Sequence, residues 1–260
     1  MVAGKIRNPQ STMRDARSAM RDPRCAMRDA RCAIRNPQSA IRNRRGRFIV
    51  LDGPDGSGKS TQARLLAEQL EKRGLEVLLL REPGGTATGE AVRRLLLRRG
   101  AMAISPLAEA FLFQAARAQL SEEVVRPALR RGAWVLCDRF SLSTLVYQGF
   151  AGGVSPRAIE KLSALATGGL HPDKYLVLWV PFGECARRRA DRAEDRMEAK
   201  GAQFLRAVAA AYRREALRAP RRYALVDGRG TIEAVRARVW RRVEGLLSSP
   251  QRHRGGHFGF

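Results

Sequence analysis

The chain has 260 residues, of which 49 are lysine or arginine and 25 are aspartate or glutamate, so its net charge is +24. Hydrophobic residues make up 44% of it, but no apolar run approaches the roughly 20 residues of a membrane span, and the N-terminus lacks the apolar core of a signal peptide. The four cysteines form no C-x-x-C pair, which argues against a disulfide framework or a zinc site: Cys25, Cys32, Cys137 and Cys185. We therefore expect a cytoplasmic protein without a membrane segment.

The basic composition raises the question of nucleic-acid binding. Only six of the 49 basic residues are lysine, a skew that fits arginine codon bias in a GC-rich genome. Aromatic residues make up 6% and are not interleaved with the basic runs, as a single-strand binder requires. We expect nucleic acid to bind only non-specifically, through the basic N-terminal extension.

The N-terminal extension, residues 1–46, contains a seven-residue repeat over residues 8–42: NPQSTMR, DARSAMR, DPRCAMR, DARCAIR, NPQSAIR. One large apolar residue per unit is too few for a coiled-coil seam, and Pro9, Pro23 and Pro37 would break a helix. With 12 basic and 3 acidic residues, the segment can bury little and we expect it to be disordered. It also resembles an arginine-rich transit peptide, or a translated tandem DNA repeat upstream of the true start, the hypothesis that we favour.

Residues 47–248 predict one α/β domain. Apolar runs at 48–52, 76–80, 133–137, 175–179 and 223–226 read as strands, and helical patterns cover 59–73, 88–98, 106–131, 155–166, 201–217 and 231–247. Strands without polar alternation indicate a five-stranded parallel sheet covered by helices on both faces. Ligands then bind beyond the carboxyl ends of the strands. Residues 249–260 are polar and glycine-rich, and we expect a flexible tail.

The first predicted strand runs directly into a phosphate-binding motif, G-x-x-x-x-G-K-S, at Gly53, Gly58, Lys59 and Ser60. Glycines allow several backbone N–H groups to point at one anion, and the N-terminus of the following helix adds its positive dipole end. Lys59 would contact the β- and γ-phosphates, and the Ser60 hydroxyl would hold Mg²⁺. The motif predicts binding of a nucleoside triphosphate.

Two further strand ends carry candidate site residues. The rigid loop Arg81-Glu82-Pro83-Gly84-Gly85-Thr86 leaves Arg81 free to meet an anion, although an ordinary turn would have the same sequence. The next strand ends at Asp138-Arg139-Phe140-Ser141, where the carboxylate of Asp138 can hold Mg²⁺ or serve as a helix N-cap.

Two helical segments are also candidates. Phe113 and Arg117 share a helix face and could stack on and hydrogen-bond a base, unless they are a core aromatic and a surface arginine. Residues 187–198, RRRADRAEDRME, read either as a solvated charged helix or as a mobile lid that closes over transferring phosphates.

Taken together and in this order, the stretches FIVLDGPDGSGKSTQ, REPGGT, FQAARAQ, CDRFSLSTLVYQG and DRME resemble the thymidylate kinase family, which phosphorylates dTMP to dTDP with ATP for dTTP synthesis. The resemblance runs from about Phe48 to the helix near Tyr212. It implies a P-loop nucleoside monophosphate kinase fold, Mg²⁺, ATP as co-substrate and a homodimer. The alternatives are a kinase for another nucleoside monophosphate or a deoxynucleoside, and a nucleotide- or nucleic-acid-binding protein without turnover.

The resemblance also implies roles for individual residues. Asp55 would accept a hydrogen bond from the 3′-hydroxyl of dTMP, Phe113 would stack on thymine, and Arg117 would donate a hydrogen bond to the carbonyl edge of that base. Catalysis would fall to Lys59, Arg139 and the lid residues Arg187, Arg189 and Arg192, and the metal to Ser60 and Asp138. Arg139 would bind the phosphate of dTMP, and Tyr147 would line its deoxyribose and exclude a 2′-hydroxyl. The residues expected to contact the ATP phosphates are Gly53, Pro54, Asp55, Gly56, Ser57, Gly58, Lys59, Ser60 and Thr61. Those expected to contact dTMP are Asp55, Arg81, Pro83, Phe113, Arg117, Arg139, Thr144, Tyr147 and Gln148.

Members of this family supply their catalytic arginine either from the phosphate loop, directly after its acidic residue, or from the lid. Gly56 follows Asp55 here, and the lid is rich in arginine, so the chain resembles the lid type found in bacteria. One position departs from the family pattern, because Asp191 stands where the last lid arginine is expected, with Arg192 beside it. The resemblance therefore leaves open which lid arginine reaches the transition state.

Overall fold

A computed structural model describes residues 46–98, 103–191 and 193–248. All of them belong to one compact unit, Arg44–Phe260. The expectations for the extension up to residue 45, for the tail 249–260 and for Arg192 lie outside the described residues.

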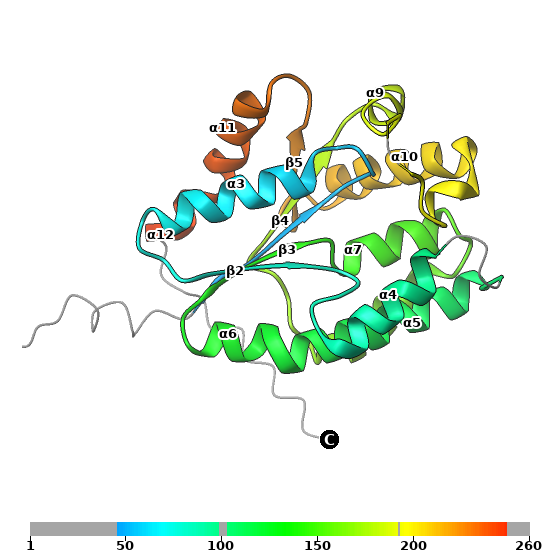
Figure 1. The fold of residues 1–260 in the computed structure, drawn as a ribbon, viewed down its shortest axis with the longest axis horizontal. Helices are drawn as coiled ribbons and strands as arrows, with labels where there is room; N and C mark the ends of the chain where they lie inside the picture. Colours follow the sequence, from blue (N-terminus) through cyan, green and yellow to red (C-terminus); the bar gives the residue numbers. More distant parts are fainter. Residues whose placement is uncertain (1–45, 99–102, 192, 249–260) are drawn as a thin grey trace, which may run out of the picture. The chain divides into compact units, whose positions relative to one another are not determined.

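The domain is built on a five-stranded parallel sheet with the order β2-β3-β1-β4-β5 (Figure 1). The strands are β1 (Phe48–Asp52), β2 (Val77–Arg81), β3 (Trp134–Asp138), β4 (Lys174–Trp179) and β5 (Tyr223–Asp227). Each lies within one residue of its predicted position, and the predicted parallel sheet is confirmed. β1, every residue of which is buried, occupies the centre, as expected for an uninterrupted apolar run.

Helices cover both faces of this sheet. On one face, α3 (Lys59–Glu71), α11 (Ile232–Val243) and α12 (Gly245–Ser248) pack apolar side chains against those of the strands, among them Ile49 and Leu136. The predicted helix 231–247 thus divides into α11 and α12. α3 and α11 pack against each other and lie on the same side of the sheet in Figure 1.

The opposite face carries the larger core. It is covered by α5 (Pro106–Leu120), the π-helical segment η1 (Ser121–Val125), α6 (Arg126–Arg130), α8 (Pro156–Thr167) and α10 (Ala202–Arg218). The predicted helix 106–131 corresponds to α5, η1 and α6 in succession. α4 (Ala87–Leu97) packs on α5. Thr86 and Ser105 cap the N-termini of α4 and α5 by accepting backbone N–H groups.

Three segments had no predicted helix: α7 (Ser141–Thr144) with the π-helical η2 (Leu145–Phe150), α9 (Phe182–Arg187), and the short 3₁₀ turn η3 (Glu198–Lys200). None of the described helices is long and apolar enough to cross a membrane.

The strand register brings the motifs to one edge of the sheet. Asp138 at the end of β3 pairs with Leu51 of β1 on one side and with Arg81 of β2 on the other. Because all five strands run parallel, the phosphate loop after β1 lies between the residues that follow β3 and those that follow β4.

Candidate active site

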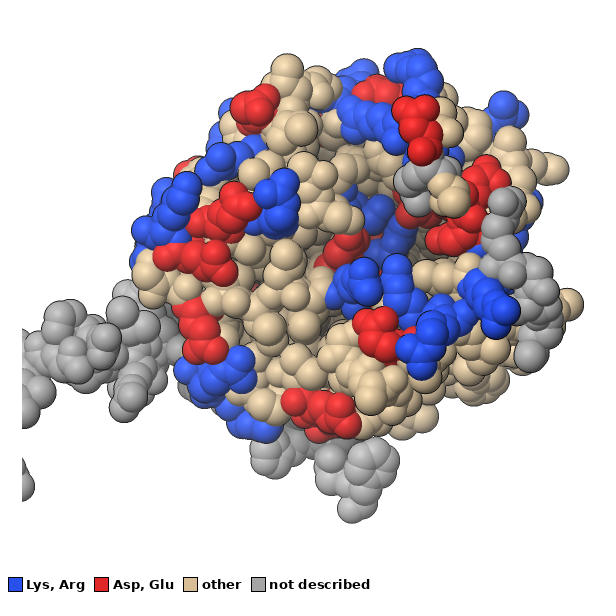
Figure 2. All heavy atoms as spheres, in the orientation of Figure 1, with Lys and Arg blue, Asp and Glu red and all other residues tan. Residues whose placement is uncertain are grey.

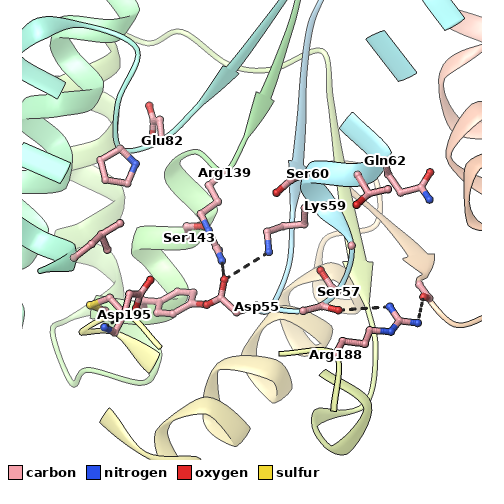
Figure 3. A pocket seen from close by; sticks show the side chains of 18 of the residues that line it. Asp55, Ser57, Lys59, Ser60, Gln62, Glu82, Arg139, Ser143, Arg188 and Asp195 are labelled. Atoms are coloured by element: carbon pink, nitrogen blue, oxygen red, sulfur yellow. Dashed lines mark hydrogen bonds and ion pairs between the residues drawn. The ribbon is translucent and has the colours of Figure 1, made fainter. Parts of the chain in front are cut away.

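A cavity of about 740 Å³ lies at the carboxyl edge of the sheet. Its lining joins the phosphate loop to residues after β2 and β3, to α5 and to the lid (Figure 3). Figure 2 shows a hollow on this side of the molecule, between α3 and α4, with basic side chains around it. The predicted residues that line the cavity are Asp55, Gly56, Ser57, Gly58, Lys59, Ser60, Thr61, Pro83, Phe113, Arg139, Thr144, Tyr147 and Gln148.

The phosphate loop adopts a conformation that its glycines permit. Gly53, Gly56 and Gly58 have φ values of 140°, 85° and 91°, which side chains strongly disfavour. A Cβ on Gly53 would lie 2.2 Å from the carbonyl oxygen of Leu178. Lys59 is buried, and its Nζ donates to the Pro54 carbonyl at 3.0 Å. Burial and the nearby Arg139 lower the pKa of Lys59, although Asp55 opposes this shift.

Arg139 and Asp55 form an ion pair at the centre of the cavity (Figure 3). Arg139 has a φ of 73°, a rare conformation for a residue with a side chain and one that often marks a functional site. Burial would raise the pKa of Asp55, but Arg139, Lys59 and a 2.6 Å hydrogen bond from Tyr147 outweigh it and hold this pKa far below its usual value. Asp55 is therefore a carboxylate that only accepts hydrogen bonds.

A buried polar group that the sequence analysis missed supports Arg139. Asp52, fully buried at the end of β1, accepts hydrogen bonds from Ser143 and Tyr212, both at 2.7 Å. Arg139 in turn donates to Ser143 at 3.1 Å and to Tyr212 at 3.2 Å. The sequence does carry a signal for Asp52, because an acidic residue that ends an apolar strand directly before a phosphate loop is placed near the site.

Ser60 and Asp138 meet at the side of the loop nearest β3. The Ser60 hydroxyl donates to Asp138 Oδ2, whereas Asp138 Oδ1 is buried without a partner among the described residues. An orphaned carboxylate oxygen beside a hydroxyl is a donor set that suits Mg²⁺, which takes oxygen ligands and usually retains several from water and phosphate. The described residues contain no cluster of three or more His, Cys, Asp or Glu that could hold a metal by itself, so phosphates and water would complete such a shell.

Arg81 also lies near Ser60 and Asp138, on the side of the phosphate loop nearest β3. It lines a second cavity of about 380 Å³ together with Ser60 and Asp138, and not the main cavity. Its side chain is 60% exposed and approaches Glu90 at 3.8 Å.

Arg117 is placed differently from the expected base contact. It is only 1% exposed and is not among the residues that line the cavity. Its guanidinium pairs with Glu82 at 2.7 Å and donates to Gln114 at 2.8 Å and to Thr144 at 3.1 Å. Arg117 thus reaches the cavity wall through Thr144, while Phe113 reaches it directly.

The lid arginines differ in their positions. Arg188 lines the cavity, and donates to the Gly56 carbonyl at 3.5 Å and to the Gly228 carbonyl at 3.1 Å (Figure 3). Arg189 packs against Gly56 and pairs with buried Glu198 at 3.4 Å. Arg187 is exposed and lines no part of the cavity.

Arg93 on α4 is a cavity-lining residue for which the sequence analysis had no motif. It donates to the carbonyl of Pro83 at 3.0 Å and so lies beside the loop that follows β2. Its position two turns into the helix after that loop was the only signal.

Comparison with known proteins identifies this arrangement. The family model for thymidylate kinase matches residues 51–239, which include every residue that lines the main cavity. The chain belongs to the thymidylate kinase family.

Individual members of the thymidylate kinase family match most of the chain. The thymidylate kinase of Afipia carboxidovorans is 43% identical over 209 residues, covering 79% of this chain and 92% of that protein. The thymidylate kinase of Pseudomonas putida is 45% identical over 203 residues, covering 78% of this chain and 97% of that protein. The crystal structure of thymidylate kinase from Ehrlichia chaffeensis superposes with a TM-score of 0.60 at 31% identity, covering 76% of this chain and 98% of that one.

Proposed function

We propose that the protein transfers the γ-phosphoryl group of ATP to the phosphate of dTMP, giving dTDP and ADP on the route to dTTP. The observation that carries this proposal is the single cavity that joins the phosphate loop to Phe113, Thr144 and Gln148. Two nucleotides can enter it from opposite ends with their phosphates meeting between Lys59 and Arg139.

At the acceptor end, Phe113 would stack on thymine, with Thr144 and Gln148 beside it. The carboxylate of Asp55 suits a sugar hydroxyl donor, and Tyr147, which donates to Asp55, would crowd a 2′-hydroxyl. Arg139 would exchange part of its pairing with Asp55 for the acceptor phosphate.

At the donor end, backbone N–H groups of the phosphate loop and the N-terminus of α3 would hold the ATP phosphates. The cavity continues past Gln62 to Ile232 and Val235 on α11, and these apolar side chains offer a surface to the adenine.

The chemistry requires no general base, because the attacking oxygen of a phosphate monoester is already anionic near neutral pH. The protein must bring two like-charged phosphates together and neutralise the charge that spreads over the transferring group. Lys59, Arg139 and the lid arginines Arg188 and Arg189 would do so. Mg²⁺ held by Ser60 and Asp138 would neutralise phosphate oxygens when bound.

Three further assignments belong to this proposal. Exposed apolar side chains on the packed helices α5 and α8, namely Leu107, Phe111 and Leu165, support a homodimer. The free, buried thiols of Cys137 and Cys185 suit a reducing cytoplasm. Residues 1–46 would be an extension with at most non-specific affinity for nucleic acid, and 249–260 a tail.

The test is a coupled assay of the full chain with ATP, Mg²⁺ and a panel of acceptors: dTMP, dUMP, dCMP, dGMP and thymidine. We expect the highest kcat/KM with dTMP and no turnover of thymidine, which lacks the acceptor phosphate. A higher kcat/KM with any other acceptor would overturn the assignment of the substrate.

A further inference from the structure

Glu109 on α5 is a completely buried carboxylate that contacts three donors and is absent from the roles assigned above. Its Oε1 accepts from Arg196 at 2.8 Å and from Lys200 at 2.8 Å, and its Oε2 accepts from Gln148 at 3.0 Å and from Lys200 at 2.9 Å. Burial would raise the pKa of Glu109, but the hydrogen bonds from Lys200 and Gln148 outweigh it, so the pKa is lowered. Glu109 is therefore ionised and can only accept hydrogen bonds.

One side of this carboxylate holds the end of the lid. Arg196 contacts Glu109 and also donates through Nε to the Leu96 carbonyl at 2.6 Å, and its backbone N–H donates to the Leu97 carbonyl at 3.2 Å. The residues on either side of Arg196, Asp195 and Met197, line the main cavity. Glu109 thus ties the C-terminal end of the lid to α4 and α5.

The other side of the carboxylate orients a residue of the acceptor end. Gln148 lines the cavity and is only 1% exposed. Because Glu109 can only accept, the NH₂ group of Gln148 must face it, and the carbonyl Oε1 must face away. This oxygen has no hydrogen-bond partner among the described residues and is available to a ring N–H donor at the cavity.

We propose that Glu109 is a positioning residue that fixes the Gln148 amide with its carbonyl toward the base, so that the pocket selects a pyrimidine carrying an N3–H donor, while the same carboxylate seats the lid. The inference rests on the proposed function, since it assigns the base to this end of the cavity. It assigns the choice between thymine-like and cytosine-like bases to a residue that touches neither.

The variant E109Q separates these roles from simple stabilisation. Arg196 contacts only the Oε1 position and keeps the oxygen of the new amide there, so its NH₂ group replaces Oε2 and faces both Gln148 and Lys200. Gln148 must then turn its own oxygen toward position 109 and present NH₂ to the base. The probes are dTMP and 5-methyl-dCMP, which keeps the methyl group but has an acceptor at N3. We expect the ratio of their kcat/KM values to fall at least about tenfold, since an unpaired polar group discriminates strongly.

Lys200→Met is the matched control, because it removes one cation from Glu109 and leaves the contact with Gln148. It should slow turnover through a looser lid and keep the dTMP preference. An unchanged ratio in E109Q, even with reduced thermal stability, or an equal shift in Lys200→Met, would overturn the proposal. Calorimetry gives the ratio of the two dissociation constants without any turnover, and this ratio should shift in the same direction. Absence of kinase activity in the wild type would therefore count against the proposed function alone.

Discussion

Gly56 of the phosphate loop lies directly against Arg189 of the lid. A Cβ at Gly56 would lie 3.2 Å from Arg189 Cγ and 2.6 Å from the carbonyl oxygen of Cys185. The backbone of α9 and the Arg189 side chain of the lid therefore occupy the space that a side chain at this position of the loop would need, which agrees with a catalytic arginine that comes from the lid.

Gly56→Ala should lower both stability and turnover. The left-handed backbone, with a φ of 85°, costs a side chain about 1–2 kcal/mol, and the contact with Cys185 adds to this. Gly153→Ala is the control, because Gly153 has a φ of 80° and a Cβ there would meet nothing within 4 Å. Urea unfolding and the kinase assay should show the larger loss in Gly56→Ala, and equal losses would mean that the lid contact is unimportant.

Arg139→Ala should lower turnover with dTMP by about two orders of magnitude or more, because it removes a charge that faces the transferring group. Arg139→Lys keeps the charge and loses the forked geometry that reaches Asp55 and Ser143 together, so it should give an intermediate rate. Circular dichroism checks that both variants fold. A rate near that of the wild type in Arg139→Ala would remove Arg139 from the catalytic set.

The sequence predicted the sheet and named many of the residues that line the cavity, because those signals are local. Fully apolar strands and a glycine-rich turn before a helix need no tertiary information, and they placed β1, Lys59 and Asp138 correctly in the fold. The spacing of Phe113 and Arg117 predicted a shared helix face, but it could not show that Glu82, 35 residues earlier, holds Arg117 inside the protein.

Other features depend on long-range contacts and left no local pattern. The side chains that donate hydrogen bonds to Glu109 lie 39 to 91 positions later in the sequence, so the role of Glu109 cannot be predicted from its own helix. The segment that forms α7 and η2 has two serines, a threonine and a glycine among its ten residues, which weaken a helix prediction, and it packs against α8 and α10 in the fold.

Asp55 makes the stability of the protein depend on pH in a defined direction. Its pKa is held well below the value of about 3.9 that an aspartate has in an unfolded chain, so its interactions stabilise the folded state above that pH and are lost as the pH falls below it. Asp55→Asn cannot titrate. The difference in unfolding free energy between wild type and Asp55→Asn should therefore be constant from about pH 7 to pH 5 and should shrink at lower pH. Urea denaturation across this range measures it, and a difference that stays constant down to pH 3 would contradict the ion pair with Arg139.

Asp138→Asn should weaken the response to Mg²⁺ while leaving the fold intact. The substitution removes the charge next to Ser60 and places an amide where the buried, unpartnered Oδ1 now lies. We expect the Mg²⁺ concentration for half-maximal activity to rise about tenfold, as for the loss of a group that orients a metal's ligands. The control is Asp173→Asn, because Asp173 pairs with Arg47 and lines neither the main cavity nor the cavity beside Asp138. An unchanged Mg²⁺ requirement in Asp138→Asn would place the metal elsewhere.

Removal of the N-terminal extension should leave the kinase intact only if the cut comes before Gly46. The Gly46 N–H donates to the Leu129 carbonyl at 3.0 Å, and the buried side chain of Arg47 pairs with Asp173 at 3.3 Å. A fragment that begins at residue 46 should therefore keep its dTMP turnover and unfolding free energy. One that begins at residue 48 should lose about 1–3 kcal/mol through its unpaired partners. Both fragments lose all 12 basic residues of the extension, and the shorter one also loses Arg47, so both should leave a DNA column at lower salt than the full chain. Retention equal to that of the full chain would mean that the domain, which keeps 35 basic and 22 acidic side chains over residues 47–248, binds nucleic acid by itself.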